Sequence, residues 1–374
     1  MTVMKKAGGG LPRLGLIGPI LPHRGGIAQH TTMLHRTLRE KVDLLSVSFK
    51  KLYPKWLYPG RTVLDTGHKG HKEDGVTYAL DPLNPITWEK VCRLFIKHAP
   101  HAVIIPWWTV FCTPCYLSIC SYLRQKGIKI LFLCHNVVEH EMTEWKMMVS
   151  KLVLSQGSHF FMHSEAEAAR LKALLPEADI SVYPHPVYHQ FPTPRVKHRR
   201  RAKLELLFFG LVRPYKGLDI LIEAMHQLKK EDIFLTIAGE WWYKDETLKK
   251  RIEAVKGRIE VVDRYITEEE AAAFFSRADA VVLPYRNGTG SGVIPLAYHY
   301  GKPVITTTVG GLPEVVVDGV SGRLVKPEDP DALAKVLQEF LQKNPASMQE
   351  GVRKTGESMT WEGLTECILD IIRK

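Results

Sequence analysis

Short apolar runs alternate with amphipathic stretches along most of this 374-residue chain. Runs such as 14–20 and 128–134 have the length and composition of strands that are buried on both faces. Stretches between them, such as 26–39, repeat apolar residues at helical spacing. Because each return to a parallel strand needs a crossover, this alternation predicts parallel sheets covered by helices.

The alternation starts again near residue 204, and a chain of this length exceeds one ordinary core. We therefore expect an α/β protein with two Rossmann-like domains and a cleft at the carboxyl ends of their strands. The expected parts are a first domain at 1–190, a basic linker at 191–203, a second domain at 204–355, and a last helix within 356–374. That helix either caps the second domain or crosses back to the first. The expected strands are 14–20, 43–48, 102–106, 128–134 and 159–163, then 204–209, 233–238, 259–262, 280–283 and 303–306.

Charge separates the same regions. Residues 1–190 hold 23 basic and 14 acidic residues, a net charge of +9, whereas 191–203 carry +6 and 204–374 carry −4. A basic strip can bind nucleic acid, but a solvated linker explains this strip more simply, so we expect no nucleic-acid partner. The six cysteines lie mostly in apolar segments, which is typical of buried thiols in a reducing cytoplasm. The lone pair Cys112 and Cys115 has no second pair to complete a zinc site.

Three segments predict an anion-binding cleft. Segment 209–217 joins a strand to a helix and brings Arg213 and Lys216 into the turn, where fixed positive charge stabilises a leaving diphosphate. Segment 287–293 is a glycine-rich loop that leads into a helix and presents backbone N–H groups to an anion. In segment 22–30, Gly25 and Gly26 let the backbone approach a ligand closely. The G-x-G-x-x-G pattern of dinucleotide-binding folds is absent there.

Taken together, these motifs resemble the family-4 glycosyltransferases, which share the GT-B fold and retain anomeric configuration. The resemblance covers most of the chain and is densest at 204–333. In the first half, segment 25–30 and segment 135–137 with His140 and Glu141 fit the family. The segments that carry the resemblance in the second half are 209–210 with 216–217, 283–285, 301–305, 310–316, and 318–319 with Gly322.

The resemblance implies a role for each matching residue. His135 is expected to contact the transferred sugar, with a structural histidine as the alternative. Glu314 either caps its own helix or contacts the donor. The predicted catalytic residues are His135, Arg213 and Lys216; the predicted donor-binding residues are Gly210, Arg213, Lys216, Tyr265, Tyr285, Ser291, Gly292, Val293 and Glu314; and those expected on the acceptor and diphosphate side are Gly25, Gly26, His30 and Asn136.

The chain also departs from the family pattern. The two glutamates that usually stand eight apart are replaced by Gly288 and Leu296, and Leu211 stands where the family has an arginine, with Arg213 as its substitute. We interpret these changes as variation within the family, although the glutamates help to select the donor.

Segment 50–61 interleaves basic and aromatic residues. It suits an anionic membrane surface or a lipid-linked acceptor, and equally a loop packed on its own domain with extended lysines.

The expected function is a retaining transfer of sugar from a nucleotide-diphosphate donor to a glycan or lipid-linked acceptor, in polysaccharide or glycoconjugate synthesis. We expect no metal and no other cofactor, because basic residues supply the positive field and the spacing of His135, His140 and Glu141 fixes no coordination geometry. No protein nucleophile is evident, which favours direct front-side transfer. A cytoplasmic protein, peripheral on the inner face of the membrane, fits these features, since no apolar run is long enough to span it. The alternatives are a catalytically inactive nucleotide-binding partner subunit and a GT-B sugar-nucleotide epimerase.

Overall fold

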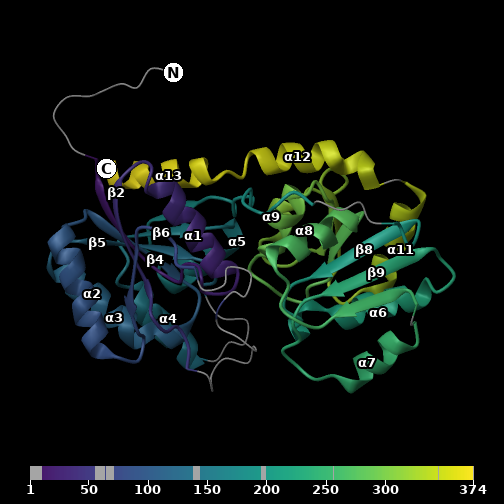
Figure 1. Cartoon of the computed structure of the whole chain (residues 1–374), viewed down its shortest axis with the longest axis horizontal. Coiled ribbons are helices and arrows are strands. Elements are labelled where there is room, and N and C mark those ends of the chain that lie inside the picture. The colour runs from purple at the N-terminus through teal and green to yellow at the C-terminus, as the bar shows by residue number, and fades with distance from the viewer. Residues whose placement is uncertain are drawn as a thin grey trace.

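The computed structural model describes residues 11–54, 64, 71–137, 144–194, 199–255, 257–343 and 345–373. Two α/β domains stand side by side, with the first at the left and the second at the right of Figure 1. Each domain contains one all-parallel sheet. The structure therefore confirms the predicted α/β class with two Rossmann-like domains.

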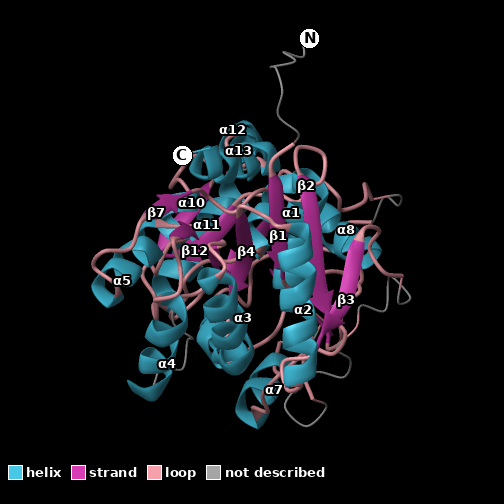
Figure 2. Cartoon of the chain, turned by 90° about the vertical axis from the view of Figure 1, so that its left-hand side faces the viewer, coloured by secondary structure: helices cyan, strands magenta, loops and turns pink. Residues whose placement is uncertain are grey.

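The first domain is built on a seven-stranded sheet in the order β3-β2-β1-β4-β5-β6-β7. Helix α1, together with the C-terminal helix α13, covers one face, and the other helices cover the opposite face. Figure 2 shows α2, α3 and α4 side by side against this sheet. The strands are β1 (Arg13–Ile17), β2 (Asp43–Phe49), β3 (Val76–Leu80), β4 (Ala102–Trp107), β5 (Lys129–Cys134), β6 (His159–Met162) and β7 (Ile180–Val182), and the helices are α1 (Gly26–Leu38), α2 (Pro85–His98), α3 (Thr113–Gln125), α4 (Glu144–Leu154) and α5 (Glu165–Leu174).

The second domain has a six-stranded sheet in the order β10-β9-β8-β11-β12-β13. Helices α6, α7 and α11 pack on one face, and α8, α9 and α10 pack on the face nearer the first domain's core. Its elements are β8 (Leu204–Phe209), α6 (Leu218–Gln227), β9 (Ile233–Ala238), α7 (Glu246–Glu253), β10 (Ile259–Val262), α8 (Glu268–Arg277), β11 (Ala280–Leu283), α9 (Val293–His299), β12 (Val304–Thr307), α10 (Leu312–Val315), β13 (Gly322–Val325) and α11 (Pro330–Gln342).

The basic linker is exposed at Arg200 and Arg201 and also pairs with the second domain. Arg200 forms an ion pair with Asp279 at 2.6 Å, and Arg201 forms ion pairs with Glu205 and Glu260. The Glu205 side chain is almost fully buried, so Arg201 neutralises a carboxylate that burial would otherwise penalise. The solvated linker stays a prediction for the rest of 191–203, of which 195–198 lie outside the described residues.

The C-terminal segment returns to the first domain. Helix α12 (Gln349–Glu357) contacts α9 of the second domain, and α13 (Trp361–Arg373) packs on α1 of the first. Figure 1 shows the two helices running along one edge of both domains. Where the chain crosses, the Val187 amide donates to the Met359 carbonyl, and the Trp361 indole N–H donates to the Val187 carbonyl. The structure thus places the last helix on the first domain.

The cysteines of the first domain are buried among apolar side chains. Cys112 and Cys115 lie in the core between the sheet and its α2–α5 face, and all six thiols are free. Burial raises the pKa of the Cys92 thiol to about 11. These thiols are therefore protonated and unreactive at neutral pH. Within the described residues, no helix is both long and apolar enough to cross a membrane.

Replacing Trp361 with alanine should destabilise the chain strongly. The indole is 2% exposed, packs against His30 and donates a hydrogen bond to the crossing segment. Loss of a buried tryptophan costs about 3–5 kcal/mol, so the free energy of unfolding, measured with denaturant, should fall by this amount. The matched control is Glu362→Ala on the same helix, whose side chain is exposed and whose loss should change little.

Candidate active site

The strand orders place the site between the two domains. In the first sheet the order reverses between β1 and β4, and in the second between β8 and β11. Loops that follow the strands diverge at such a switch point and leave a crevice where ligands bind. Two cavities occupy this region and share Gly26, Tyr188 and residues 290–292 as a common wall. We call them the basic cavity, which contains Arg24 and Lys216, and the histidine cavity, which contains His135 and His163.

Lys216 is the buried cation of the basic cavity. It ends the short turn η2 (Pro214–Lys216) after β8, and its side chain is 7% exposed. Burial, with a smaller contribution from Arg213, lowers the pKa of its ammonium to about 8. A Cβ on Gly210 would lie only 3.2 Å from Lys216 Nζ, so glycine leaves room for the amine at the cavity wall. Because burying a cation without an anion is costly, this arrangement favours an anionic ligand.

Arg24 is a second cation at this cavity, and sequence reasoning missed it. Its guanidinium forms an ion pair with Glu240 of the second domain, and both side chains are about 95% buried. It also lies 4.3 Å from the centre of the Tyr265 ring. Arg24 comes from the loop after β1 and Glu240 from the loop after β9, so a pair between distant segments left no local signal.

Arg213 occupies a different position from the one predicted. It is not among the residues that line the basic cavity, and its guanidinium lies 5.8 Å from the Tyr215 ring and 5.5 Å from the Trp242 ring. Its contact with the donor stays a prediction. The other cavity-lining residues that the sequence had predicted are Gly25, Gly26, Gly210, Tyr265, Tyr285, Ser291, Gly292 and Val293.

The glycine-rich loop reaches both cavities through Ser291. The Ser291 hydroxyl lies 3.1 Å from the Tyr285 hydroxyl and accepts the backbone N–H of Val293 at 3.3 Å. The Val293 amide is therefore already engaged, and the helix begins at Val293, two residues later than the predicted start at 291. The backbone of the glycine-rich loop therefore folds around Ser291, which lies between the two cavities.

The positions of the two missing glutamates differ in surroundings. Leu296 lines the basic cavity and gives it an apolar wall, whereas Gly288 contacts the turn at Gly310 through its carbonyl oxygen. Two carboxylates from other segments line this cavity instead, those of Glu240 and Glu268. The cavity thus keeps acidic groups, although they come from different elements.

Glu314 joins the two domains. Its carboxylate accepts the backbone N–H groups of Glu165 and Ala166 at 2.6 and 2.9 Å, at the start of α5 in the first domain. The interpretation that Glu314 caps its own helix is therefore wrong, because it caps a helix across the cleft. It lines neither cavity, so its predicted contact with the donor gains no support.

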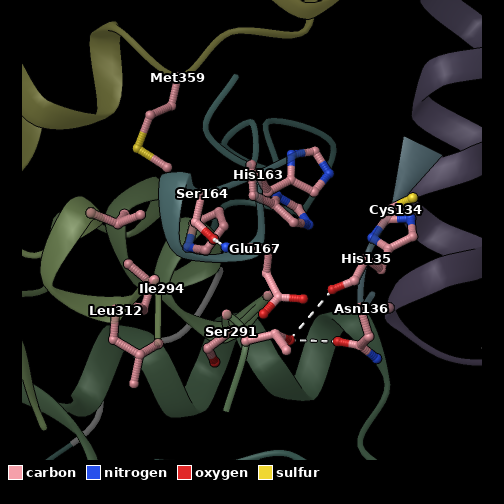
Figure 3. Close-up of a pocket in the computed structure, with 18 of the residues that line it drawn as sticks. Cys134, His135, Asn136, His163, Ser164, Glu167, Ser291, Ile294, Leu312 and Met359 are labelled. Carbon is pink, nitrogen blue, oxygen red and sulfur yellow. Dashed lines mark hydrogen bonds between the residues drawn. The ribbon is translucent and has the colours of Figure 1, made fainter. Parts of the chain in front are cut away.

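His135 and Asn136 follow β5 and line the histidine cavity (Figure 3). The Asn136 side chain and the His135 carbonyl both contact the Thr289 hydroxyl of the second domain. Burial, and then the neighbouring His163 and His185, hold the pKa of His135 well below its usual value. A neutral imidazole can hydrogen-bond a sugar hydroxyl without adding charge to the cavity.

The histidine cavity contains further groups that sequence reasoning did not single out. His163 and Glu167 follow β6, and His185 follows β7. The Glu167 carboxylate accepts the Val137 N–H at 2.9 Å, and burial raises its pKa. Each residue stands just beyond a strand, which was the only signal available. The predicted His30 lies beneath this cavity, 1% exposed and packed against His135.

Two predicted features fall outside the described residues. Positions 55–61 of the basic and aromatic loop are among them, as are His140 and Glu141.

Comparisons with known proteins agree with this geometry. Residues 203–343 match the family model described as glycosyl transferases group 1. The chain is 29% identical over 218 residues to a D-inositol 3-phosphate glycosyltransferase from Xylanimonas cellulosilytica, which covers 55% of this chain and 52% of that protein. It is 31% identical over 173 residues to an uncharacterized glycosyltransferase from Methanocaldococcus jannaschii, covering 44% and 46%. The chain thus spans about half the length of the curated relatives that it matches.

Solved structures share the fold along the full chain. A sucrose-phosphate synthase from Thermosynechococcus elongatus superposes with a TM-score of 0.73 at 19% identity, covering 97% of this chain and 98% of that one. HepE from Anabaena, solved in complex with UDP-glucose, superposes with a TM-score of 0.74 at 15% identity, covering 96% and 99%.

Two Rossmann-like domains that face each other across a ligand crevice, with these neighbours, define a GT-B protein. Within that class, residues 203–343, which make up most of the second domain, match the family model of the group 1 glycosyl transferases. Both findings confirm the resemblance to family-4 glycosyltransferases that the motifs had indicated.

The pKa of Lys216 makes anion binding depend on pH. A bound diphosphate favours the protonated amine, so the complex keeps a proton that the free protein loses above a pKa of about 8. Affinity for UDP or another nucleoside diphosphate should therefore be constant near pH 7 and fall above pH 8, by up to about tenfold per pH unit. Titration calorimetry between pH 7 and 9.5 measures this. Lys216→Arg, whose guanidinium stays charged, should bind with a flat profile, and a flat wild-type profile would contradict the assignment.

Proposed function

We propose that this chain is a retaining glycosyltransferase that moves a sugar from a nucleotide-diphosphate donor to an acceptor held by the first domain. One observation carries the proposal: Lys216, a buried cation without an acidic partner among the described residues, lies in a cavity that shares a wall with a second cavity lined by hydroxyl-binding side chains. Two joined cavities suit a donor and an acceptor that meet at one reacting carbon.

The basic cavity receives the nucleotide diphosphate. Lys216 meets the phosphates, and their negative charge grows as the sugar leaves, so its ammonium binds the transition state more tightly than the ground state. Arg24 stands at the same cavity and adds positive potential, although Glu240 partly offsets its charge. HepE, which has the same fold, was solved in complex with UDP-glucose, and this supports a nucleotide sugar as the donor.

The histidine cavity receives the sugar and the acceptor. His135 and Asn136 line the histidine cavity (Figure 3), and there they hydrogen-bond the sugar and hold its anomeric carbon beside the acceptor hydroxyl. The hydroxyl attacks from the face that the diphosphate leaves, and the leaving phosphate takes its proton. His135 therefore works by positioning and does not act as a base. The acceptor is a glycan or a lipid-linked glycan.

Substitutions at the two cavities should separate these roles. Lys216→Ala should weaken nucleoside-diphosphate binding by about ten- to a hundredfold, because a hydrogen bond to a charged group contributes about 1.5–3 kcal/mol. His135→Ala should lower turnover but leave nucleotide affinity and melting temperature nearly unchanged. Lys249→Ala, on the exposed side of α7, is the control.

A thermal-shift screen of nucleotide sugars identifies the donor first, and product analysis with candidate glycan acceptors then measures transfer.

The outcomes distinguish the alternatives. Nucleotide binding without transfer to any acceptor would support an inactive partner subunit. This alternative is considered because Gly288 and Leu296 replace both family glutamates. Conversion of one sugar nucleotide to another without an acceptor would support an epimerase. Unchanged nucleotide affinity in Lys216→Ala would overturn the assignment of the donor site itself.

Transfer should not require Mg²⁺ or Mn²⁺. Lys216 and Arg24 already supply positive charge where a metal ion would otherwise neutralise the diphosphate. Initial rates should therefore stay within about twofold when EDTA replaces added Mg²⁺. Loss of activity in EDTA that added Mg²⁺ or Mn²⁺ restores would show that the proposal of metal independence is wrong.

A further inference from the structure

Four histidines meet at the floor of the histidine cavity. His30 comes from α1, and His135, His163 and His185 come from the segments after β5, β6 and β7. The ring centres of His30 and His135 are 4.7 Å apart, those of His30 and His163 are 5.0 Å apart, and those of His135 and His163 are 5.4 Å apart. Three strands and one helix of the first domain thus bring imidazoles from distant parts of the chain into contact.

Three of these rings have a nitrogen without a partner. The Nε2 atoms of His30, His135 and His163 are fully buried and make no hydrogen bond within the described structure. His185 differs, since its Nε2 lies 3.1 Å from the Tyr188 hydroxyl and its Nδ1 contacts the Pro186 carbonyl. Buried polar atoms in native proteins nearly always have partners, so three unpartnered nitrogens in one place indicate a missing ligand.

The hydrogen bond made by His163 leaves a lone pair on its Nε2 that can bind a cation. His163 Nδ1 lies 2.9 Å from the Tyr183 carbonyl, which can only accept, so Nδ1 carries the hydrogen and Nε2 keeps its lone pair. A hydrogen bond from the other ring nitrogen to a carbonyl is what orients metal-binding histidines.

The spacing fits a transition metal. One ring nitrogen from each of the three histidines lies within 4.8 Å of the other two. Tetrahedral zinc, with Zn–N distances of about 2.0–2.1 Å, needs its ligand nitrogens about 3.4 Å apart, so side-chain rotations bring them into range. Imidazole nitrogens without a carboxylate select Zn²⁺, Co²⁺, Ni²⁺ or Cu²⁺ over Mg²⁺ or Ca²⁺.

We propose that His30, His135 and His163 form a binding site for a divalent transition metal such as Zn²⁺, and that metal bound there blocks glycosyl transfer. The site lies at the edge of the histidine cavity, because His135 and His163 line that cavity and His30 lies beneath it. A metal held by His135 Nε2 removes the group that positions the sugar. The inhibitory part rests on the proposed function, whereas the metal site rests on the histidine geometry alone.

Metal binding is tested on the full chain after treatment with a chelator and dialysis. Co²⁺ should bind with one equivalent per chain and give the visible absorption of a tetrahedral centre, and Zn²⁺ should displace it, whereas millimolar Mg²⁺ should not. His30→Gln and His163→Gln should each lower Zn²⁺ affinity by about a hundredfold or more. The control is His226→Gln in the second domain, where the ring contacts the Arg251 carbonyl, far from the cluster in sequence and fold.

Each outcome has a definite meaning. Melting temperatures in EDTA show whether a variant is folded. Because two ligand residues are replaced separately, the test still works if one of the two variants does not fold. Equal Zn²⁺ affinity in the wild type and both variants, or no Co²⁺ spectrum, would overturn the site. Tight binding that leaves transfer untouched would overturn the inhibition only. If no transfer is found with any acceptor, the Co²⁺ titration still decides whether the site exists.

Discussion

The buried ion pair between Arg24 and Glu240 determines how closely the two domains approach. Each partner comes from a different domain, and both are almost fully shielded from water. Replacing either residue would leave the charge of the other buried without this counter-ion, which costs about 3–5 kcal/mol. The capping of α5 by Glu314 and the contact of Thr289 with Asn136 lie across the same interface. Together these contacts hold the carboxyl ends of both sheets at the separation that creates two adjoining cavities.

The turn at Gly310 and Gly311 leaves no room for a side chain. A Cβ on Gly311 would lie 2.4 Å from the Ser164 side chain, and one on Gly310, where φ is +52°, would lie 1.9 Å from the Gly288 carbonyl. At Gly311 the second domain therefore approaches the first so closely that only glycine fits, whereas Gly310 packs within the second domain. Ser291 lines both cavities. A ligand that moves the glycine-rich loop in one cavity therefore changes the shape of the other cavity.

The sequence predicted the buried strands well and the interface poorly. The bounds of β8, β9, β10 and β11 match the expected ranges. For β8, β9 and β11 the reason is that most side chains are buried on both faces, whereas β10 is a partly exposed edge strand that its apolar residues still marked. The edge strands β3 and β7 were missed, since they are short and partly exposed. In the site, Lys216 and Ser291 stand in local motifs. The pairing of Arg24 and the direction of Glu314 depend on contacts between segments more than 100 residues apart, and the histidine cluster joins four separate segments, which no local pattern records.

The two chain crossings have a mechanical consequence. Residues near Val187 lead into the second domain, and residues near Met359 lead back, and the two segments are hydrogen-bonded to each other. Two adjacent covalent connections leave the domains one easy relative movement, a rotation about the line through both. Shearing or twisting would stretch one connection against the other. Opening would therefore be widest at the rim opposite α12 and α13 (Figure 1), so large ligands should enter and leave from that side, while the side with the two crossings stays closed.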